Sequence, residues 1–171
     1  MKAAFVVLGI AALFLGSGRA SAAPVVEVDF VSPDKYSDAS PFSRSIDERE
    51  RDAVLKQLRR HMQLEAVKFL RGDSDRLNID VLDVDLAGEV QLTRDGREHR
   101  VLTERMPPRI NLRYTLVRGG VESSREERVT ELGYLFDPNQ CRFDGALCRE
   151  KVMLDVWFER TFARAPAPGS R

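Results

Sequence analysis

The sequence predicts an α+β domain: a mainly antiparallel sheet of about four to five strands with two α-helices packed on one face. Three observations lead to this fold class. The predicted elements run in the order strand, helix, three to five strands, helix; two long segments repeat apolar residues at three- and four-residue spacings; and most other apolar residues alternate with polar ones. No linker or internal repeat divides the chain, so we expect one domain over residues 23–163 and a disordered tail at residues 164–171.

The first expected strand covers residues 25–31, where valines and a phenylalanine alternate with acids. A second strand is expected at residues 77–86. Its alternation changes phase between Val81 and Leu82, which predicts either a β-bulge or a strand covered on both faces.

Two hairpins are expected after these strands. Residues 109–118 alternate regularly, and Gly119-Gly120 predicts a tight turn into a polar strand at residues 121–132, which suits a sheet edge. A shorter hairpin is expected from residues 90–92 and 99–102, around an Asp-Gly turn.

The first helix is expected to begin at Ser45, whose side chain would form a capping box with Glu48, and to end at about Arg71, just before Gly72. Its apolar stripe consists of Leu55, Leu58, Met62, Ala66 and Phe69.

The second helix is expected at about residues 147–163. Val152 and Val156 lie opposite its broad apolar face, so we expect this helix to be covered on more than one side. The residues of the apolar face are Leu147, Leu154, Trp157, Phe158 and Phe162.

The N-terminus has the pattern of a secretory signal peptide. Lys2 supplies a positive charge, residues 3–16 are uncharged and mostly apolar, and Ala20-Ser21-Ala22 fits the small-residue cleavage pattern. The apolar run is shorter than the roughly 20 residues that a membrane-spanning helix needs, and an uncleaved anchor is the alternative interpretation. We therefore expect a cleaved signal peptide at residues 1–22 and a periplasmic or secreted protein.

The charge composition argues against a nucleic-acid partner. The chain has 27 lysines and arginines and 27 aspartates and glutamates, and loss of residues 1–22 removes Lys2 and Arg19 but no acid. Charges of both signs are mixed along the chain, without the basic block that follows a phosphate backbone. No segment after the signal peptide is apolar enough to span a membrane.

Cys141 and Cys148 are expected to form a disulfide, because an exported chain meets an oxidising compartment and an Asp-Gly turn lies between them. A bond across so short a loop would contribute about 2–3 kcal/mol on the chain-entropy model. Two free thiols are the alternative, while the spacing suits neither a redox motif nor zinc.

The stretch NIDVLDVDLAGE raises the question of a metal site, because it carries Asp80, Asp83 and Asp85. A calcium loop needs oxygen ligands at alternate positions and a glycine at a sharp turn, whereas branched apolar residues here interrupt the acids and favour a strand. Asp83 and Asp85 share one face of that strand and remain the metal candidates. The favoured interpretation places these acids at a sheet edge or in pairs with Arg109 and Arg113.

Few other residues suggest chemistry. Arg109 and Arg113 share a strand face and would either contact an anionic ligand or pair with Glu126 across strands. His61 lies beside the first helix's stripe, where a packing role is favoured over metal binding. The motifs G-x-S-x-G, H-E-x-x-H, the P-loop and G-x-G-x-x-G are absent, so we assign no catalytic residue and no cofactor.

Four stretches, VEVDFVSPDKYSDA, LNIDVLDVDLAGE, PPRINLRYTL and EKVMLDVWFERTF, together resemble the domain of unknown function 3016 family, which consists of small exported bacterial proteins. The likeness covers nearly the whole chain after the signal peptide, and it implies export and a single domain but no activity, substrate or cofactor. The cysteine pair is not a feature of the resemblance. The matching residues are Phe30, Pro33, Asp38, Ala39, Asp83, Asp85, Leu86, Ala87, Gly88, Pro108, Arg109, Ile110, Leu112, Tyr114, Glu150, Lys151, Met153, Leu154 and Trp157.

The sequence favours a non-enzymatic binding or interaction module of the cell envelope, with an envelope protein or another envelope component as partner. Two alternatives remain open: an envelope-polymer hydrolase that uses paired carboxylates, and a binder of small ligands or metals.

Overall fold

A computed structural model of the chain describes residues 24–44, 47–70, 72, 74–136, 141, 145 and 147–163. The predicted signal peptide, the predicted tail and Ser45 lie outside these residues.

Four strands form one sheet in the order β1–β2–β5–β6: β1 (Val25–Phe30), β2 (Arg76–Asp85), β5 (Arg109–Arg118) and β6 (Val121–Thr130). β1 pairs parallel with β2, because helix α1 carries the chain back across the sheet between them. The β2–β5 and β5–β6 pairs are antiparallel. The α+β class is confirmed, with a mixed sheet.

A register shift interrupts the pairing of β2 with β5. Val81 lies opposite Leu112 and Asp83 opposite Asn111, so Leu82 has no partner across the ladder. The predicted change of phase is therefore a β-bulge, one of the two expected outcomes. Beyond it, Val84 still faces the core, and Asp83 and Asp85 lie on the outer face of the sheet.

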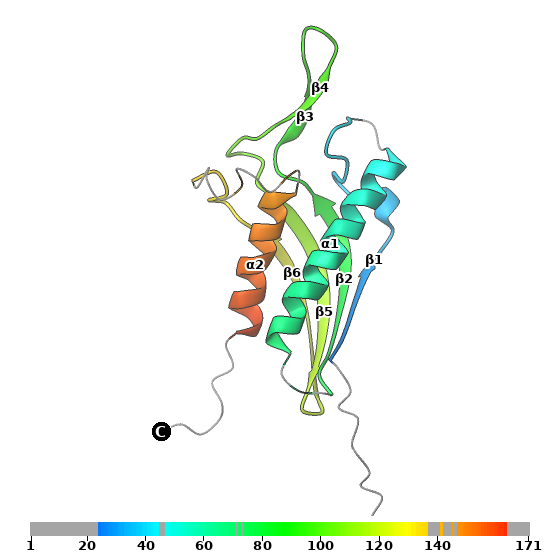
Figure 1. The fold of residues 1–171 in the computed structure, drawn as a ribbon, viewed down its shortest axis with the longest axis vertical. Helices are drawn as coiled ribbons and strands as arrows, with labels where there is room; N and C mark the ends of the chain where they lie inside the picture. The colour runs from blue at the N-terminus through cyan, green and yellow to red at the C-terminus, as the bar shows by residue number, and fades with distance from the viewer. Residues whose placement is uncertain are drawn as a thin grey trace, which may run out of the picture.

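Both predicted hairpins are confirmed. β5 turns into the edge strand β6 through Gly119 and Gly120, whose φ angles are 57° and 80°. Such positive φ angles cost most residues energy but not glycine. β3 (Glu89–Leu92) and β4 (Glu98–Val101) form a separate two-stranded ribbon that projects beyond the sheet (Figure 1).

Helix α1 (Glu48–Phe69) begins two or three residues later than a Ser45 cap would require. Asp47 is its N-cap, because the Asp47 side chain accepts hydrogen bonds from the backbone N–H groups of Arg49 and Glu50. The C-cap is Leu70 in extended conformation, so Gly72 does not have the predicted role just past the helix end.

Helix α2 (Cys148–Phe162) contributes Trp157, Phe158 and Phe162 to the core, where edge-to-face contacts join two of these rings to Tyr114 of β5. The Trp157 Nε1–H donates to Glu127 Oε2 of β6 at 3.0 Å. The expectation that α2 is covered on several sides is wrong, because Val156 is 46% exposed.

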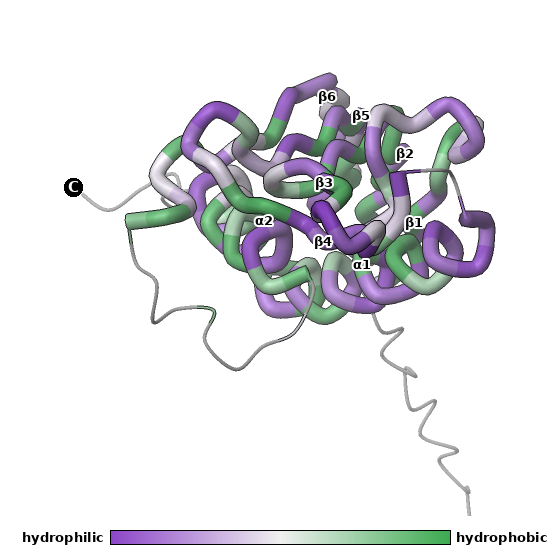
Figure 2. The backbone as a smooth tube through the Cα atoms, turned by 90° about the horizontal axis from the view of Figure 1, so that it is seen from above, coloured by the Kyte–Doolittle hydropathy of each residue, from purple (hydrophilic) through white to green (hydrophobic). Residues whose placement is uncertain are grey.

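The two helices lie on the same side of the four-stranded sheet in both views (Figures 1 and 2). The core between the layers takes its side chains from both helices and from alternate residues of the strands. No helix among the described residues is both long and apolar enough to cross a membrane.

Most of the long connections gather at one end of the sheet, where the β3–β4 ribbon projects (Figure 1). We call this the loop end; it comprises residues 31–44, 86–108 and 131–136 together with the start of α2. The β5–β6 turn lies at the opposite end. Loops held by a rigid scaffold are where binding residues most often occur, so the loop end is the first place to look for a site.

Candidate functional site

The arginines that the sequence singled out are engaged in cross-strand pairs on the outer face of the sheet. Arg109 Nε donates to Asp85 Oδ2 at 2.9 Å, and Arg113 Nη2 donates to Glu126 Oε2 at 3.3 Å. Each arginine thus has an acid on a neighbouring strand as its partner. The structure does not direct the two guanidinium groups toward one common ligand.

The two candidate metal ligands also have separate protein partners. Both carboxylate oxygens of Asp83 accept hydrogen bonds from Ser37, from its backbone N–H at 2.7 Å and its hydroxyl at 2.9 Å, while Asp85 pairs with Arg109. In the described parts of the chain, only His61, Glu65 and Asp155 bring three potential metal-ligand atoms within 4.8 Å of one another.

Asp83 instead helps to fix the segment after β1 against the end of β2. The Tyr36 hydroxyl donates to Val81 O at 2.8 Å, and beyond Ser37 the backbone of Asp38 pairs with Val84 O and the Leu86 N–H at 2.9 and 3.1 Å. The segment leaves the sheet at the end of β1 and rejoins β2 past the bulge. Hydrogen bonds therefore hold this segment against the end of β2, and we call its residues 36–41 the wall.

Arg100 of β4 ties this wall to the chain that follows β2. Its guanidinium donates to Asp38 Oδ2 and Ser40 O, both at 2.8 Å, and to the carbonyl oxygens of Pro41, Ala87 and Gly88 at 3.0–3.2 Å. A guanidinium has five N–H donors, and Arg100 uses its planar fork to join residues 59–62 positions before it to residues 12 and 13 positions before it.

Glu150 completes the loop end from the first turn of α2. It is 3% exposed, and its Oε1 accepts a hydrogen bond from the backbone N–H of Ala87 at 2.8 Å. Burial raises the pKa of the Glu150 carboxyl, and the Ala87 hydrogen bond and the charge of Arg100 oppose that rise. Glu150 thus holds the backbone at Ala87 in place, and its burial costs solvation free energy.

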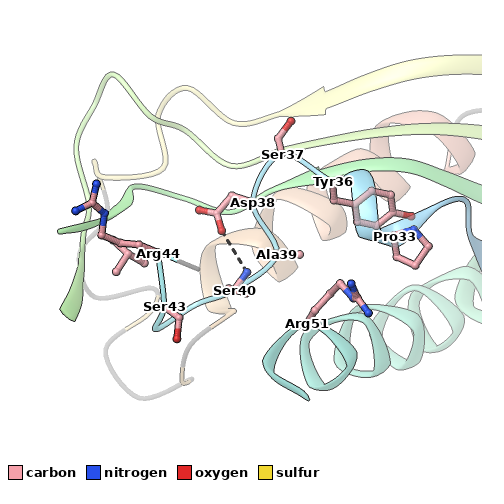
Figure 3. Close-up of a pocket in the computed structure, with 10 residues that line it drawn as sticks. Pro33, Tyr36, Ser37, Asp38, Ala39, Ser40, Ser43, Arg44 and Arg51 are labelled. Atoms are coloured by element: carbon pink, nitrogen blue, oxygen red, sulfur yellow. Dashed lines mark hydrogen bonds between the residues drawn. The ribbon is translucent and has the colours of Figure 1, made fainter. Parts of the chain in front are cut away.

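A pocket of about 240 Å³ lies between the wall and the first turns of α1; we call it the arginine pocket (Figure 3). Arg51 projects from α1 toward Pro33 and Tyr36. The Arg51 side chain is 13% exposed, and its buried Nε has no hydrogen-bond partner in the described structure. Asp52 Oδ1 lies 3.6 Å away, beyond hydrogen-bond length.

The lining of the arginine pocket combines apolar residues, such as Pro33 and Val90, with polar ones. Ser40 and Ser43 contribute hydroxyl groups, and Arg44 lies at the end opposite Arg51 (Figure 3). Asp38 also lines the pocket, but its charge is paired with Arg100. An unpaired buried guanidinium N–H beside such a cavity is a donor that lacks an acceptor.

A second pocket, of about 260 Å³, lies beside Pro41 and Arg100, and we call it the disulfide pocket. Its lining includes Phe42, Leu102, Glu150 and the Cys141–Cys148 disulfide, which is present as the sequence predicted. It is more apolar than the arginine pocket, and Phe42 at its rim is 60% exposed.

The loop end of this small α+β protein carries the arginine pocket and the disulfide pocket beside a hydrogen-bonded wall. The profile of a family described as a protein of unknown function, DUF3016, matches residues 24–160, so the chain belongs to that family. Searches of curated proteins and of solved structures found no match.

Sequence reasoning missed Arg51, Arg100 and the burial of Glu150. For Glu150 a signal existed: it lies three residues after Leu147 and four before Leu154, on the apolar stripe of its helix. Nothing in the local pattern separated Arg51 or Arg100 from the other arginines, because their environments are made by distant segments.

Proposed function

We propose that the protein is an exported, non-enzymatic binding module of the cell envelope, and that it holds an anionic group of an envelope component in the arginine pocket. Export is supported by the N-terminal sequence pattern and by the Cys141–Cys148 disulfide, since such bonds persist in oxidising compartments.

The observation that carries the proposal is the buried Arg51 Nε, which has no hydrogen-bond partner among the described residues. Leaving a buried donor unpaired costs about 1–3 kcal/mol, a cost that a ligand acceptor would remove on binding. Carboxylate and phosphate oxygens fit a guanidinium best, because the hydrogen bond is then charge-assisted. The serine hydroxyls of the lining supply further polar contacts to such a group.

The hydrolase alternative requires two acids with raised pKa values in one cleft. Burial raises the pKa of Glu150 and also that of Asp155, but Glu150 lines the disulfide pocket whereas Asp155 faces His61 of α1. Because the structure keeps these two acids in separate places, a binding role is the better-supported function.

The test is an NMR titration of isotope-labelled protein with acetate and with inorganic phosphate, the simplest carriers of the two anionic groups, and with glucose as a neutral probe. We expect saturable shifts at Tyr36, Ser40 and Arg51 for an anion and none for glucose. Arg51→Met should abolish these shifts. Arg97→Met is the matched control, because it removes the same charge from the exposed β3–β4 turn.

Three outcomes would refute the pocket assignment: no saturable shift with either anion, shifts that Arg51→Met leaves unchanged, or shifts centred on Arg109 and Arg113. The last outcome would return the ligand site to the outer face of the sheet.

A further inference from the structure

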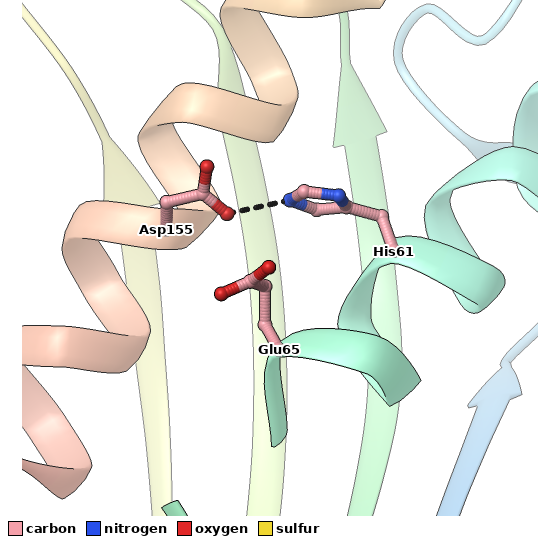
Figure 4. A group of neighbouring side chains, drawn as sticks. All are labelled: His61, Glu65 and Asp155. Atoms are coloured by element: carbon pink, nitrogen blue, oxygen red, sulfur yellow. Dashed lines mark hydrogen bonds and ion pairs between the residues drawn. The ribbon is translucent and has the colours of Figure 1, made fainter. Parts of the chain in front are cut away.

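Away from both pockets, three side chains with metal-binding chemistry meet between the helices (Figure 4). His61 and Glu65 lie one turn apart on α1, so the helix presents both on the same face. Asp155 faces them from α2, and its Oδ1 lies 2.7 Å from His61 Nε2. The three potential ligand atoms lie within 4.8 Å of one another.

We propose that His61, Glu65 and Asp155 form a zinc-binding site that links α1 to α2. The proposal is independent of the anion-binding function assigned to the arginine pocket. It also departs from the packing role that the sequence favoured for His61.

The donor atoms suit zinc. One imidazole nitrogen and two carboxylate oxygens are a set that zinc accepts, whereas calcium and magnesium prefer oxygen ligands alone. Three protein ligands leave a fourth position, which water fills in many zinc sites. Asp155 is 46% exposed while His61 and Glu65 are 17% and 12% exposed, so the open position faces solvent on the Asp155 side.

The geometry needs only small adjustments. Ligands about 2.0–2.1 Å from a tetrahedral zinc lie roughly 3.3 Å from one another. The His61–Asp155 separation of 2.7 Å is shorter than this and the 4.8 Å limit is longer. Side-chain rotations on two fixed helices would change distances of this size without moving the backbone.

The present contacts show what zinc would displace. His61 Nε2 lies within hydrogen-bond distance of two acceptors, Asp155 Oδ1 and Lys151 O, at 2.7 and 3.2 Å. Zinc at Nε2 would replace these contacts and require the ring N–H to lie on Nδ1. Lys68 already places one cation beside the site, with its Nζ 2.5 Å from Glu65 Oε1. Zinc would therefore compete with Lys68 for Glu65.

The competition between Lys68 and zinc for Glu65 distinguishes a zinc site from a packing role. Lys68 is exposed, so Lys68→Ala should leave the fold intact and free Glu65 for the metal. We expect Lys68→Ala to raise the zinc affinity about twofold or more, because an exposed ion pair is weak but not negligible. If the three residues only pack the helices together, this variant has no effect on zinc.

The main experiment measures zinc binding to untagged, chelator-treated protein by calorimetry, and the coordination geometry by the visible absorption of bound Co²⁺. We expect one zinc per chain, a melting temperature that rises with zinc concentration, and no response to Mg²⁺ or Ca²⁺. His61→Ala, Glu65→Gln and Asp155→Asn should each weaken binding at least about tenfold, since even outer partners of metal ligands cost that much.

Two features keep the result interpretable. Asp155→Asn retains an oxygen that accepts the His61 hydrogen bond, so it separates metal binding from helix packing. His99→Ala removes the other histidine, on β4, and should leave the zinc affinity unchanged. Absence of zinc binding, or binding that His61→Ala and Asp155→Asn leave unchanged, would overturn the proposal.

Discussion

Arg100 and Arg51 both lie beside the wall at the loop end and are buried to almost the same degree, with side chains 12% and 13% exposed. Arg100 donates hydrogen bonds to Asp38 and to four backbone carbonyls. Arg51 has an Nε for which the described part of the chain offers no acceptor. The two side chains are therefore equally buried but differ in hydrogen bonding. Arg100 uses its donors within the fold, whereas Arg51 keeps a donor that a ligand could use.

The comparison teaches that the unsatisfied donors of a buried charged group indicate function better than its burial does. A fully bonded arginine is a structural element, because its removal leaves several carbonyl groups without donors. An arginine with a free buried N–H carries an energetic cost that the fold tolerates and a ligand can remove.

The largest expected effect is that of Arg100→Ala. We expect the free energy of unfolding in urea to fall by about 3 kcal/mol, because the change leaves the Asp38 carboxylate and the buried carbonyls unpaired. Arg97→Ala, in the exposed turn of the same ribbon, should change it by less than about 0.5 kcal/mol. If the two variants change the unfolding free energy equally, Arg100 does not have the structural role assigned to it here.

Gly88→Ala sharpens the structural side of the comparison, because Arg100 binds the Gly88 carbonyl. Gly88 has a φ of 73°, and an added Cβ would lie 2.2 Å from Val101 O. We expect a loss of at least about 2 kcal/mol in unfolding free energy. Gly96→Ala is the matched control: its φ of 80° is equally unfavourable but its surroundings are open, so it should cost only about 1 kcal/mol. If Gly88→Ala lowers the unfolding free energy no more than Gly96→Ala does, the β3–β4 ribbon must move to make room for the added Cβ.

Glu150→Gln tests how the buried Glu150 carboxyl affects the pH dependence of the unfolding free energy. Since burial raises the folded-state pKa of Glu150 above 4.5, the folded protein binds more protons than the unfolded chain over the interval between the two pKa values. Stability must then decrease as pH rises through that interval. We expect Glu150→Gln to lack this part of the pH dependence in urea unfolding curves, and the exposed Glu159→Gln to retain it. A wild-type slope that both variants share would assign the effect to other groups.

Arg51→Met is the variant for which we expect no loss of stability. Because its Nε has no acceptor in the described structure and its contact with Asp52 is long, we expect the unfolding free energy to stay the same or to rise by up to about 1–3 kcal/mol, although anion binding is lost. A loss above about 1 kcal/mol would make Arg51 a structural residue like Arg100 and would break the comparison.

Local features were predictable from the sequence where local chemistry decides them. The bulge at Leu82 followed from the change of phase, and the β5–β6 turn followed from two glycines that tolerate positive φ. The cap of α1 was misplaced because Ser45 and Asp47 are both good caps and the sequence offers no means to choose between them.

The candidate sites were not predictable, because their partners are far apart in the chain. Arg100 meets Asp38 across 62 positions, and His61 meets Asp155 across 94. The two acids that drew attention in the sequence, Asp83 and Asp85, proved to have Ser37 and Arg109 as partners, which are also distant along the chain. The sites are formed by residues that come together only in the tertiary structure. Patterns in a single sequence give information only about residues that are close along the chain.

The parallel pairing of β1 with β2 has a consequence for the order of folding. β5 and β6 are joined by a two-residue turn and can pair early, whereas β1 must wait until the chain has passed through α1 to Arg76. The first strand to be synthesised therefore has no strand partner until α1 and β2 have followed it. If the chain crosses a membrane unfolded, as the proposed export requires, β1 cannot join the sheet until residues 76–85 have also crossed.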